Sequence, residues 1–189
     1  MNQDSCKQEN MINIFGYQGL YKIDITNQMI WSCTKKRYMS PSISGSGYKY
    51  HCLTNAFGKK KNEYIHRVFY QSYHLLDKDA MIGMEIDHIN ENKLDNSIDN
   101  LRIVTKSENS MNKSRIHSNT GFKNIHLNKK GYYECRVQGN DSLLRYRTKN
   151  LELAKKFCIV ARKNLHKEFC NHGNEVNIEE NSSSNDISN

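Results

Sequence analysis

Apolar and polar residues alternate in short runs along most of the chain, and this pattern predicts small sheets separated by turns. Residues 11–57 fit this description, with an alternating run at LYKIDI and a Ser/Gly-rich loop at 40–47. The following GKKKNEY segment, 58–64, is interpreted as a basic turn. The N-terminal part of the chain is therefore predicted to be β-rich.

A change of period marks the next element, 65–73, which is predicted to be a short amphipathic helix. His66 lies beside its apolar face, and a structural or phosphate-facing role is favoured for it over metal ligation. The apolar positions at helical spacing are Ile65, Val68, Phe69 and Tyr73.

A strand, a loop and a second strand are then predicted at 84–89, 90–100 and 101–105. The loop is rich in Asn, Asp and Ser, which bond to their own backbone in turns. Ser107 is a plausible N-cap for a helix that follows, with Glu108 in its first turn. The predicted order is strand, loop, strand, helix.

The C-terminal part predicts a three-stranded sheet covered by one helix. A hairpin turn at 128–131 separates FKNIHL from YYECRVQ, and SLLRYRT forms the third strand. Asn150 is expected to cap a helix that runs from Leu151 to about Phe169. The side chains expected to pack between sheet and helix are Tyr133, Cys135, Val137, Leu144, Tyr146 and Thr148 from the strands, and Ala154, Phe157, Cys158, Ala161 and Leu165 from the helix.

Charge is distributed unevenly along the 189 residues, whose net charge is +8. Residues 110–170 hold fourteen Lys or Arg against four acidic residues, whereas 171–189 holds four acids and no Lys or Arg. A concentrated basic block favours a polyanionic partner, since counterion release drives binding to nucleic acid. A merely solubilising basic surface is the alternative.

Other classes of protein fit the sequence less well. No apolar run is long enough to span a bilayer, and no signal peptide is apparent, which predicts a cytoplasmic protein with reduced cysteines. The six cysteines contain no C-x-x-C pair, so they offer no paired-cysteine zinc site.

The segment EIDHINENKLDNSIDNLRIVTKSENSMN, 85–112, carries the candidate chemistry. Asp87 supplies a hard anionic oxygen and Asn109 a neutral carbonyl oxygen, which together suit one Mg²⁺ or Mn²⁺ ion. His88 titrates near neutral pH and is the natural general base for water. Asp87 and His88 would face opposite sides of a regular strand, so they are expected at a strand end, where the chain turns.

The Asp-His…Asn…Asn spacing, with the strings LDNSIDNLR and SEN, resembles the HNH nucleases of phage and intron homing endonucleases. The resemblance implies a ββα-metal fold, a DNA substrate, and a role for Asn100 in tying down the loop and orienting His88 through its backbone or side chain. It also implies that Asn96 braces the loop and that Arg102 contacts a phosphate. GYQGLYKI and GYKYHCL resemble small modules that precede such nuclease cores, although a plain β-rich lead-in without DNA contact is equally favoured.

The TGFKNIH start, the sheet-then-helix order and the KEF ending resemble the APETALA2-type DNA-binding domain, over about fifty residues. A three-stranded sheet with one basic face suits insertion into a DNA major groove. A solvated face on a small α+β module is the alternative. The residues expected to touch DNA are Lys123, Arg136, Arg145 and Arg147, beside Arg102 in the nuclease core.

The overall prediction is an α+β protein, a site-specific, metal-dependent HNH endonuclease that acts on double-stranded DNA in the host of a phage or mobile element. One catalytic motif per chain favours nicking by a monomer or transient dimer, without a protein partner. Alternatives are a catalytically silent DNA-binding regulator and an RNA-binding or non-specific nuclease. The expected domains are a disordered 1–10, a β-rich module at 11–57, the nuclease core at 58–113, a linker at 114–119, the DNA-binding module at 120–170 and a disordered acidic tail at 171–189.

Overall fold

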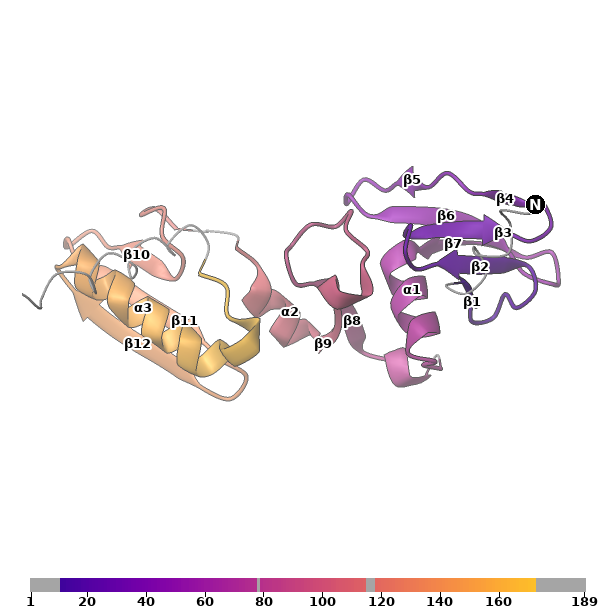
Figure 1. The fold of residues 1–189 in the computed structure, drawn as a ribbon. Helices are drawn as coiled ribbons and strands as arrows, with labels where there is room; N and C mark the ends of the chain where they lie inside the picture. The colour runs from indigo at the N-terminus through magenta and orange to yellow at the C-terminus, as the bar shows by residue number, and fades with distance from the viewer. Residues whose placement is uncertain (1–10, 78, 115–117, 173–189) are drawn as a thin grey trace, which may run out of the picture. The chain divides into compact units, whose positions relative to one another are not determined.

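The computed structural model describes residues 11–77, 79–114 and 118–172. It divides into two compact units, Met1–Lys106 and Ser107–Asn189, each of which is described by itself (Figure 1). The segment 1–10 and nearly all of 171–189, both expected to be disordered, lie outside the described residues, as do residues 115–117 of the expected linker. Within the described residues, the mixture of small sheets with three α-helices confirms the predicted α+β class.

Two antiparallel sheets form the N-terminal half of the first unit, in the strand orders β1-β2-β3-β4 and β5-β6-β7. Their short strands match the β-rich character predicted for 11–57. The strands are β1 (Met11–Asn13), β2 (Tyr21–Asp24), β3 (Met29–Ser32), β4 (Arg37–Tyr38), β5 (Ser42–Ile43), β6 (Lys49–Thr54) and β7 (Lys60–Tyr64).

The prediction of a turn at 58–64 is wrong, because most of that segment is strand β7. Tyr64 pairs with Tyr50 and Lys60 with Thr54, in register along the whole strand. The actual turn comes earlier, where Gly58 donates its backbone N–H to the carbonyl of Asn55. Since β7 is largely exposed and polar on both faces, it carries no apolar alternation by which a sequence pattern could reveal it.

Helix α1 (Ile65–Tyr73) confirms the predicted amphipathic helix. Ile65, Val68 and Phe69 are buried as expected, whereas Tyr73 is 50% exposed and lies outside the apolar face. The three buried side chains form one hydrophobic core with Ile14, Tyr17, Ile23, Ile30 and Leu53 of the N-terminal strands. The N-terminal strands and α1 therefore share a core, and the compact unit extends across the domain boundary expected at 57/58.

Strands β8 (Met84–His88) and β9 (Leu101–Thr105) form the predicted antiparallel pair. In its register Asp87 faces Arg102 and His88 faces Leu101. The intervening loop ends in a 3-10 turn over Ile98–Asn100. The hairpin thus has the expected order, with His88 as the last residue of its first strand.

Helix α2 (Lys106–Asn112) begins one residue before the predicted N-cap. Ser107 is therefore inside the helix, where its hydroxyl donates to Oδ1 of Asn140 at 2.8 Å rather than capping the first turn. Glu108 does lie in the first turn, as expected.

The second unit contains the predicted three-stranded sheet, in the order β10-β11-β12. Helix α3 (Leu151–His166) follows, and Oδ1 of Asn150 accepts from the backbone N–H of Leu153 at 3.1 Å, which confirms the predicted cap. A separate 3-10 turn over Lys167–Phe169 follows the helix. The strands are β10 (Ile125–Leu127), β11 (Tyr133–Gln138) and β12 (Leu143–Thr148).

Helix α3 packs against the sheet through the predicted stripe. Ala154, Cys158 and Ala161 are buried against Cys135 and Val137, while Phe157 and Leu165 are partly buried. On β12 the packing is looser, since Leu144 and Tyr146 remain more than a third exposed although Tyr146 stacks on Phe157 at 5.0 Å. No disulfide joins the described cysteines, and no described helix has the length and apolarity to cross a membrane.

Candidate functional site

His88 ends strand β8 with only 4% of its surface exposed, and its neighbour Asp87 is 6% exposed. The two side chains meet different partners, as the alternation of a strand requires. Nε2 of His88 lies 3.3 Å from Oδ1 of Asn96, while Oδ2 of Asp87 accepts from Nε of Arg102 at 3.0 Å. The Asp-His pair therefore presents two separate functional groups at one strand end.

Asn96 favours one tautomer of His88. Its Nδ2 donates to the carbonyl of Leu94 at 3.3 Å, so Oδ1 is the atom that faces the imidazole. An acceptor at this place favours the neutral tautomer of His88 that carries its proton on Nε2. Asn96 is 1% exposed, so this arrangement is shielded from water.

The protonation state of His88 follows from its burial. Desolvation lowers the pKa of His88 below its ordinary value, while the Asn96 contact and the charges of Asp87 and Asp95 act in the opposite direction. Because desolvation dominates, the imidazole is neutral at neutral pH. A neutral imidazole is the form that can accept a proton from water.

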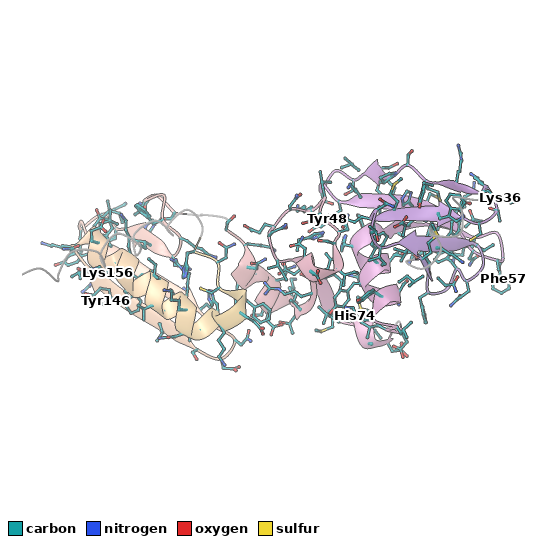
Figure 2. The ribbon with its side chains drawn as sticks, viewed as in Figure 1. Lys36, Tyr48, Phe57, His74, Tyr146 and Lys156 are labelled. Carbon is teal, nitrogen blue, oxygen red and sulfur yellow. The ribbon has the colours of Figure 1, made fainter. Side chains whose placement is uncertain are left out.

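Aromatic rings surround His88 on the side of α1 and the β5–β6 hairpin. The His66 ring centroid lies 5.2 Å from that of His88, and the Tyr48 centroid lies 4.8 Å and 5.8 Å from those of His66 and His88. Nζ of Lys93 lies 4.7 Å from the Tyr48 centroid. Tyr48, labelled in Figure 2, was not identified from the sequence, because an aromatic residue beside a strand carries no signal for a distant histidine.

His66 is buried within this group of rings, which supports the structural role expected for it. Burial, helped by the nearby His88 and Arg67, lowers the pKa of His66 to about 3. The side chain is therefore neutral over the whole physiological range of pH. Its 7% exposure leaves little surface for a phosphate.

Asn100 ties the two ends of the loop together. Its Oδ1 accepts from the backbone N–H of Asn90 at 3.0 Å, and its Nδ2 donates to the carbonyl of Asp95 at 2.9 Å. The side chain that reaches the imidazole is that of Asn96. Of the two routes expected for Asn100, backbone or side chain, the hydrogen bonds therefore leave the backbone. The main chain of Asn100 does accept from Ile89 N at 2.9 Å, next to His88.

Asp87 and Arg102 form an ion pair across the hairpin, with Nη2 of Arg102 at 2.9 Å from Oδ2 of Asp87. Both side chains are largely buried. The Arg102 guanidinium was expected to contact a phosphate, and the Asp87 carboxylate was expected to bind a metal ion. In this structure the two groups pair with each other. The pair directs the Asp87 carboxylate and offsets part of its charge.

The second predicted metal ligand, Asn109, lies in the middle of helix α2 and belongs to the second compact unit. No group of three or more His, Cys, Asp or Glu side chains in the described ranges is arranged to hold a metal ion. The two predicted metal ligands are the carboxylate of Asp87 and the carboxamide oxygen of Asn109. Such oxygen donors fit Mg²⁺, which keeps several of its waters in proteins.

The exposed face of the second unit carries the predicted basic side chains. Arg136 and Arg145 are directly opposite each other on β11 and β12, and Arg147 is opposite Glu134. The Arg147 guanidinium also lies 5.1 Å from the Tyr132 ring centroid, which holds it against the sheet. This surface, Arg136, Arg145 and Arg147, is called the basic face below.

Lys123 does not belong to the basic face. It is 8% exposed, and its Nζ donates to the carbonyls of Met111 at 3.1 Å and Asn171 at 2.8 Å. The structure therefore gives no support to the expected DNA contact of Lys123, because its ammonium group is used in packing the unit together.

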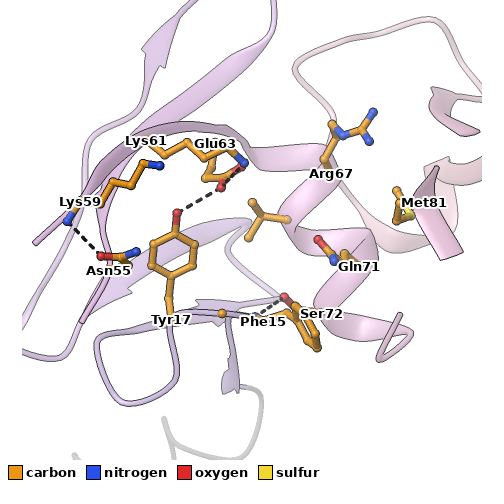
Figure 3. A pocket seen from close by; sticks show the side chains of 12 residues that line it. Phe15, Tyr17, Asn55, Lys59, Lys61, Glu63, Arg67, Gln71, Ser72 and Met81 are labelled. Atoms are coloured by element: carbon orange, nitrogen blue, oxygen red, sulfur yellow. Dashed lines mark hydrogen bonds and ion pairs between the residues drawn. The ribbon is translucent and has the colours of Figure 1, made fainter. Parts of the chain in front are cut away.

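A separate hollow of about 360 Å³ lies between α1 and the N-terminal strands (Figure 3). Glu63 accepts from Tyr17 at 3.1 Å and from Lys61 at 2.8 Å within it, and Arg67 and Gln71 of α1 line it. Neither Asp87 nor His88 lines this hollow. It is therefore distinct from the predicted catalytic residues.

Comparison with known proteins finds a match over the segment that contains Asp87 and His88. Residues 63–111 match the family model described as HNH endonuclease, and the matched segment includes Asp87, His88, Asn100 and Asn109. No curated protein matches the chain. A solved structure described as DNA binding and cleavage by the HNH homing endonuclease I-HmuI matches with 21% identity and a TM-score of 0.45, over 83% of this chain and 91% of that one. That likeness is too remote to assign residues.

Proposed function

We propose that this chain is a site-specific, metal-dependent DNA endonuclease of the homing type, in which His88 is the general base. The observation that carries the proposal is the His88–Asn96 contact inside the segment that matches HNH endonucleases. A buried, neutral imidazole with a defined tautomer is a group prepared to take a proton from water. The host of a phage or mobile element remains the proposed setting.

In the proposed mechanism each residue has one task. His88 accepts the proton of the attacking water through Nδ1, and Asn96 holds the ring by accepting from Nε2. Asn100 keeps the loop closed, so that Asn96 stays against the imidazole. Hydrolysis on this scheme leaves a 5′-phosphate and a 3′-hydroxyl.

Asp87 and Asn109 are proposed to hold one Mg²⁺ or Mn²⁺ ion, with Arg102 orienting the Asp87 carboxylate. The assignment of Asn109 rests on its spacing from His88 in the sequence. When bound, the metal supplies Lewis acidity and offsets the charge on the leaving oxygen. The buried carboxylate of Asp87 is the anionic ligand that such an ion requires.

Double-stranded DNA is the proposed substrate, held by the basic face on an APETALA2-like module. The direct juxtaposition of Arg136 and Arg145 supports this proposal, because like charges opposite each other in a sheet are destabilising unless an anion separates them. Phosphates of the backbone are the natural counter-charge. One motif per chain favours a nick in one strand per binding event.

The proposal is tested by incubating supercoiled DNA from a set of genomic loci with the protein, in Mg²⁺, in Mn²⁺ and in EDTA. The His88→Ala variant is compared with His74→Ala, which removes an exposed histidine of the same unit, labelled in Figure 2. Metal-dependent open circles, present with His74→Ala and absent with His88→Ala, are expected. Linear product would indicate paired active sites instead of a nicking monomer.

Two results would contradict the proposal. Cleavage that survives His88→Ala removes His88 as the base. Tight, specific retardation of DNA without cleavage of any locus in either metal would favour the catalytically silent regulator.

A further inference from the structure

The loop that carries Asn96 is bonded to strands far away in the sequence. The backbone N–H of Asn96 donates to Oε1 of Gln28 at 2.8 Å, across 68 residues. Nζ of Lys49 donates to the carbonyl of Leu94 at 3.0 Å, and Nζ of Lys93 donates to the carbonyl of Ser46 at 2.8 Å. Three hydrogen bonds thus join the loop to the N-terminal strands and turns. The bond from Gln28 is made to Asn96, whose side chain contacts His88.

Gln28 is placed for this contact by an unusual backbone. It lies in the turn between β2 and β3 with φ of +51°, a conformation that L side chains rarely adopt and that favours glycine. The turn itself is closed by Asn27, whose N–H and Nδ2 both donate to Asp24 at 2.9 Å. The Gln28 side chain is therefore not needed to close the turn, and it is directed at the loop.

Gln28 also acts on the residue before Asn96 in the loop, Asp95. Hydrogen bonds from Ser97 are the main cause that lowers the pKa of Asp95, and Asn90 and Gln28 contribute smaller hydrogen bonds to that carboxyl. The Gln28 carboxamide thus accepts from the Asn96 main chain and also helps lower the pKa of the Asp95 carboxyl. Since Asn96 is 1% exposed, water cannot readily replace its partners.

We infer that Gln28 is a positioning residue for catalysis, which acts on His88 through Asn96. Oε1 of Gln28 holds the Asn96 main chain, and Oδ1 of Asn96 holds Nε2–H of the imidazole. The inference rests on the proposed function, since it takes His88 as the base. It extends the active site to the β2–β3 turn, which lies outside the segment that matches HNH endonucleases.

The decisive variant is Gln28→Gly, which removes the side chain and relieves the positive φ at the same time. If the Gln28 side chain has no role beyond the turn, the variant should be at least as stable and as active as the native protein. A positioning role predicts a single-turnover cleavage rate lower by about 10-fold, the lower end of the range found when outer-shell partners are removed. DNA affinity should stay within about 2-fold, because the basic face is unchanged.

The matched control is Asn27→Ala, which loosens the same turn without touching the loop. Imidazole ¹⁵N resonances of His88, identified by their loss in His88→Ala, provide a readout that does not need cleavage. The native protein should show one Nε2–H tautomer, Gln28→Gly a mixture of both tautomers, and Asn27→Ala the native pattern.

Each result decides the inference. A Gln28→Gly protein with native resonances overturns it, whether or not its cleavage rate falls, because any effect would then bypass His88. Equal changes in Gln28→Gly and Asn27→Ala also overturn it, in favour of a general effect of the turn. If the native protein cuts no DNA, the proposed function fails while the resonances still test the link between Gln28 and His88.

Discussion

The loop around His88 and the basic face of the second unit use polar side chains in opposite ways. Around His88 the polar groups are buried, with Asn96 at 1%, His88 at 4% and Asp87 at 6% exposure. On the basic face Arg136, Arg145 and Arg147 are exposed in a regular register. The buried hydrogen bonds around His88 fix the positions of individual atoms. The exposed arginines create a positive electrostatic potential that attracts a polyanion.

This difference predicts how each region responds to substitution. A buried polar group cannot be replaced by water, so the loss of one partner should change the reaction sharply. Exposed cations contribute separately to phosphate contacts and depend on salt. Cleavage and DNA binding should therefore be separable, and the predictions on Asp87, Asn96 and the basic face test that separation.

The largest effect is expected for Asp87→Ala. Loss of the anionic metal ligand should reduce cleavage by about 1000-fold, because Lewis-acid stabilisation is worth several kcal/mol. DNA affinity in EDTA should change by no more than about 2-fold, since phosphate contacts position the duplex elsewhere. Nicking of supercoiled DNA and gel retardation measure the two quantities.

The control for Asp87→Ala is Asp99→Ala, which removes an exposed carboxylate of the same hairpin. It should cut at the native rate. If Asp87→Ala also abolished binding, the hairpin would be part of the DNA-binding surface and the separation would fail.

Asn96→Ala should reduce the single-turnover rate by about 10- to 100-fold, as is common when a partner that orients a functional side chain is lost. Asn96→Asp retains an acceptor oxygen for Nε2 of His88 and should lose less. Rates at saturating DNA provide the measurement. Equal losses in the two variants would show that the loop conformation matters more than the contact with the imidazole.

Arg145→Ala combined with Arg147→Ala should weaken DNA binding and flatten its dependence on salt by about one unit of slope per lost phosphate contact. Cleavage at saturating DNA should remain within about 2-fold. Titrations at several salt concentrations measure the slope. Lys156→Ala with Lys163→Ala, on the exposed face of α3, makes the same change in charge and should leave the slope unchanged.

The last prediction concerns stability. His66 has a folded-state pKa of about 3 against an ordinary value of 6.5, so the unfolded chain binds the proton first. The stabilisation is present above pH 6.5 and is lost as pH falls toward 3, by about 1.4 kcal/mol per pH unit. Urea unfolding between pH 7 and pH 4.5 should show a steeper loss in the native protein than in His66→Leu, and parallel curves would refute the assignment.

The regular elements could be predicted because their signal is local. Cys135 and Val137 alternate with Arg136 on β11, and the helical spacing of Ala154, Cys158 and Ala161 marks the buried side of α3. Strand β7 was missed because it is polar on both faces, and Tyr73 was misassigned because periodicity alone does not show where the core ends.

The candidate site was predictable only in part. The spacing of Asp87, His88, Asn100 and Asn109 pointed to the segment that matches the HNH endonuclease model. It did not distinguish Asn96 from Asn100 as the side chain that meets the imidazole, since either could reach it from an irregular loop. Lys123 was assigned to DNA from its charge, whereas carbonyl acceptors and burial determine its actual place.

The sequence by itself determined the order of the elements, the basic block and the residue types of the proposed catalytic centre, because these depend on near neighbours along the chain. Only the tertiary structure decided that the N-terminal strands share a core with α1, that Arg102 pairs with Asp87, and that Gln28 bonds to Asn96. The reason is physical: a hydrogen bond or an ion pair depends on ångström-scale distances between groups that may be 68 residues apart, and folding alone brings them together.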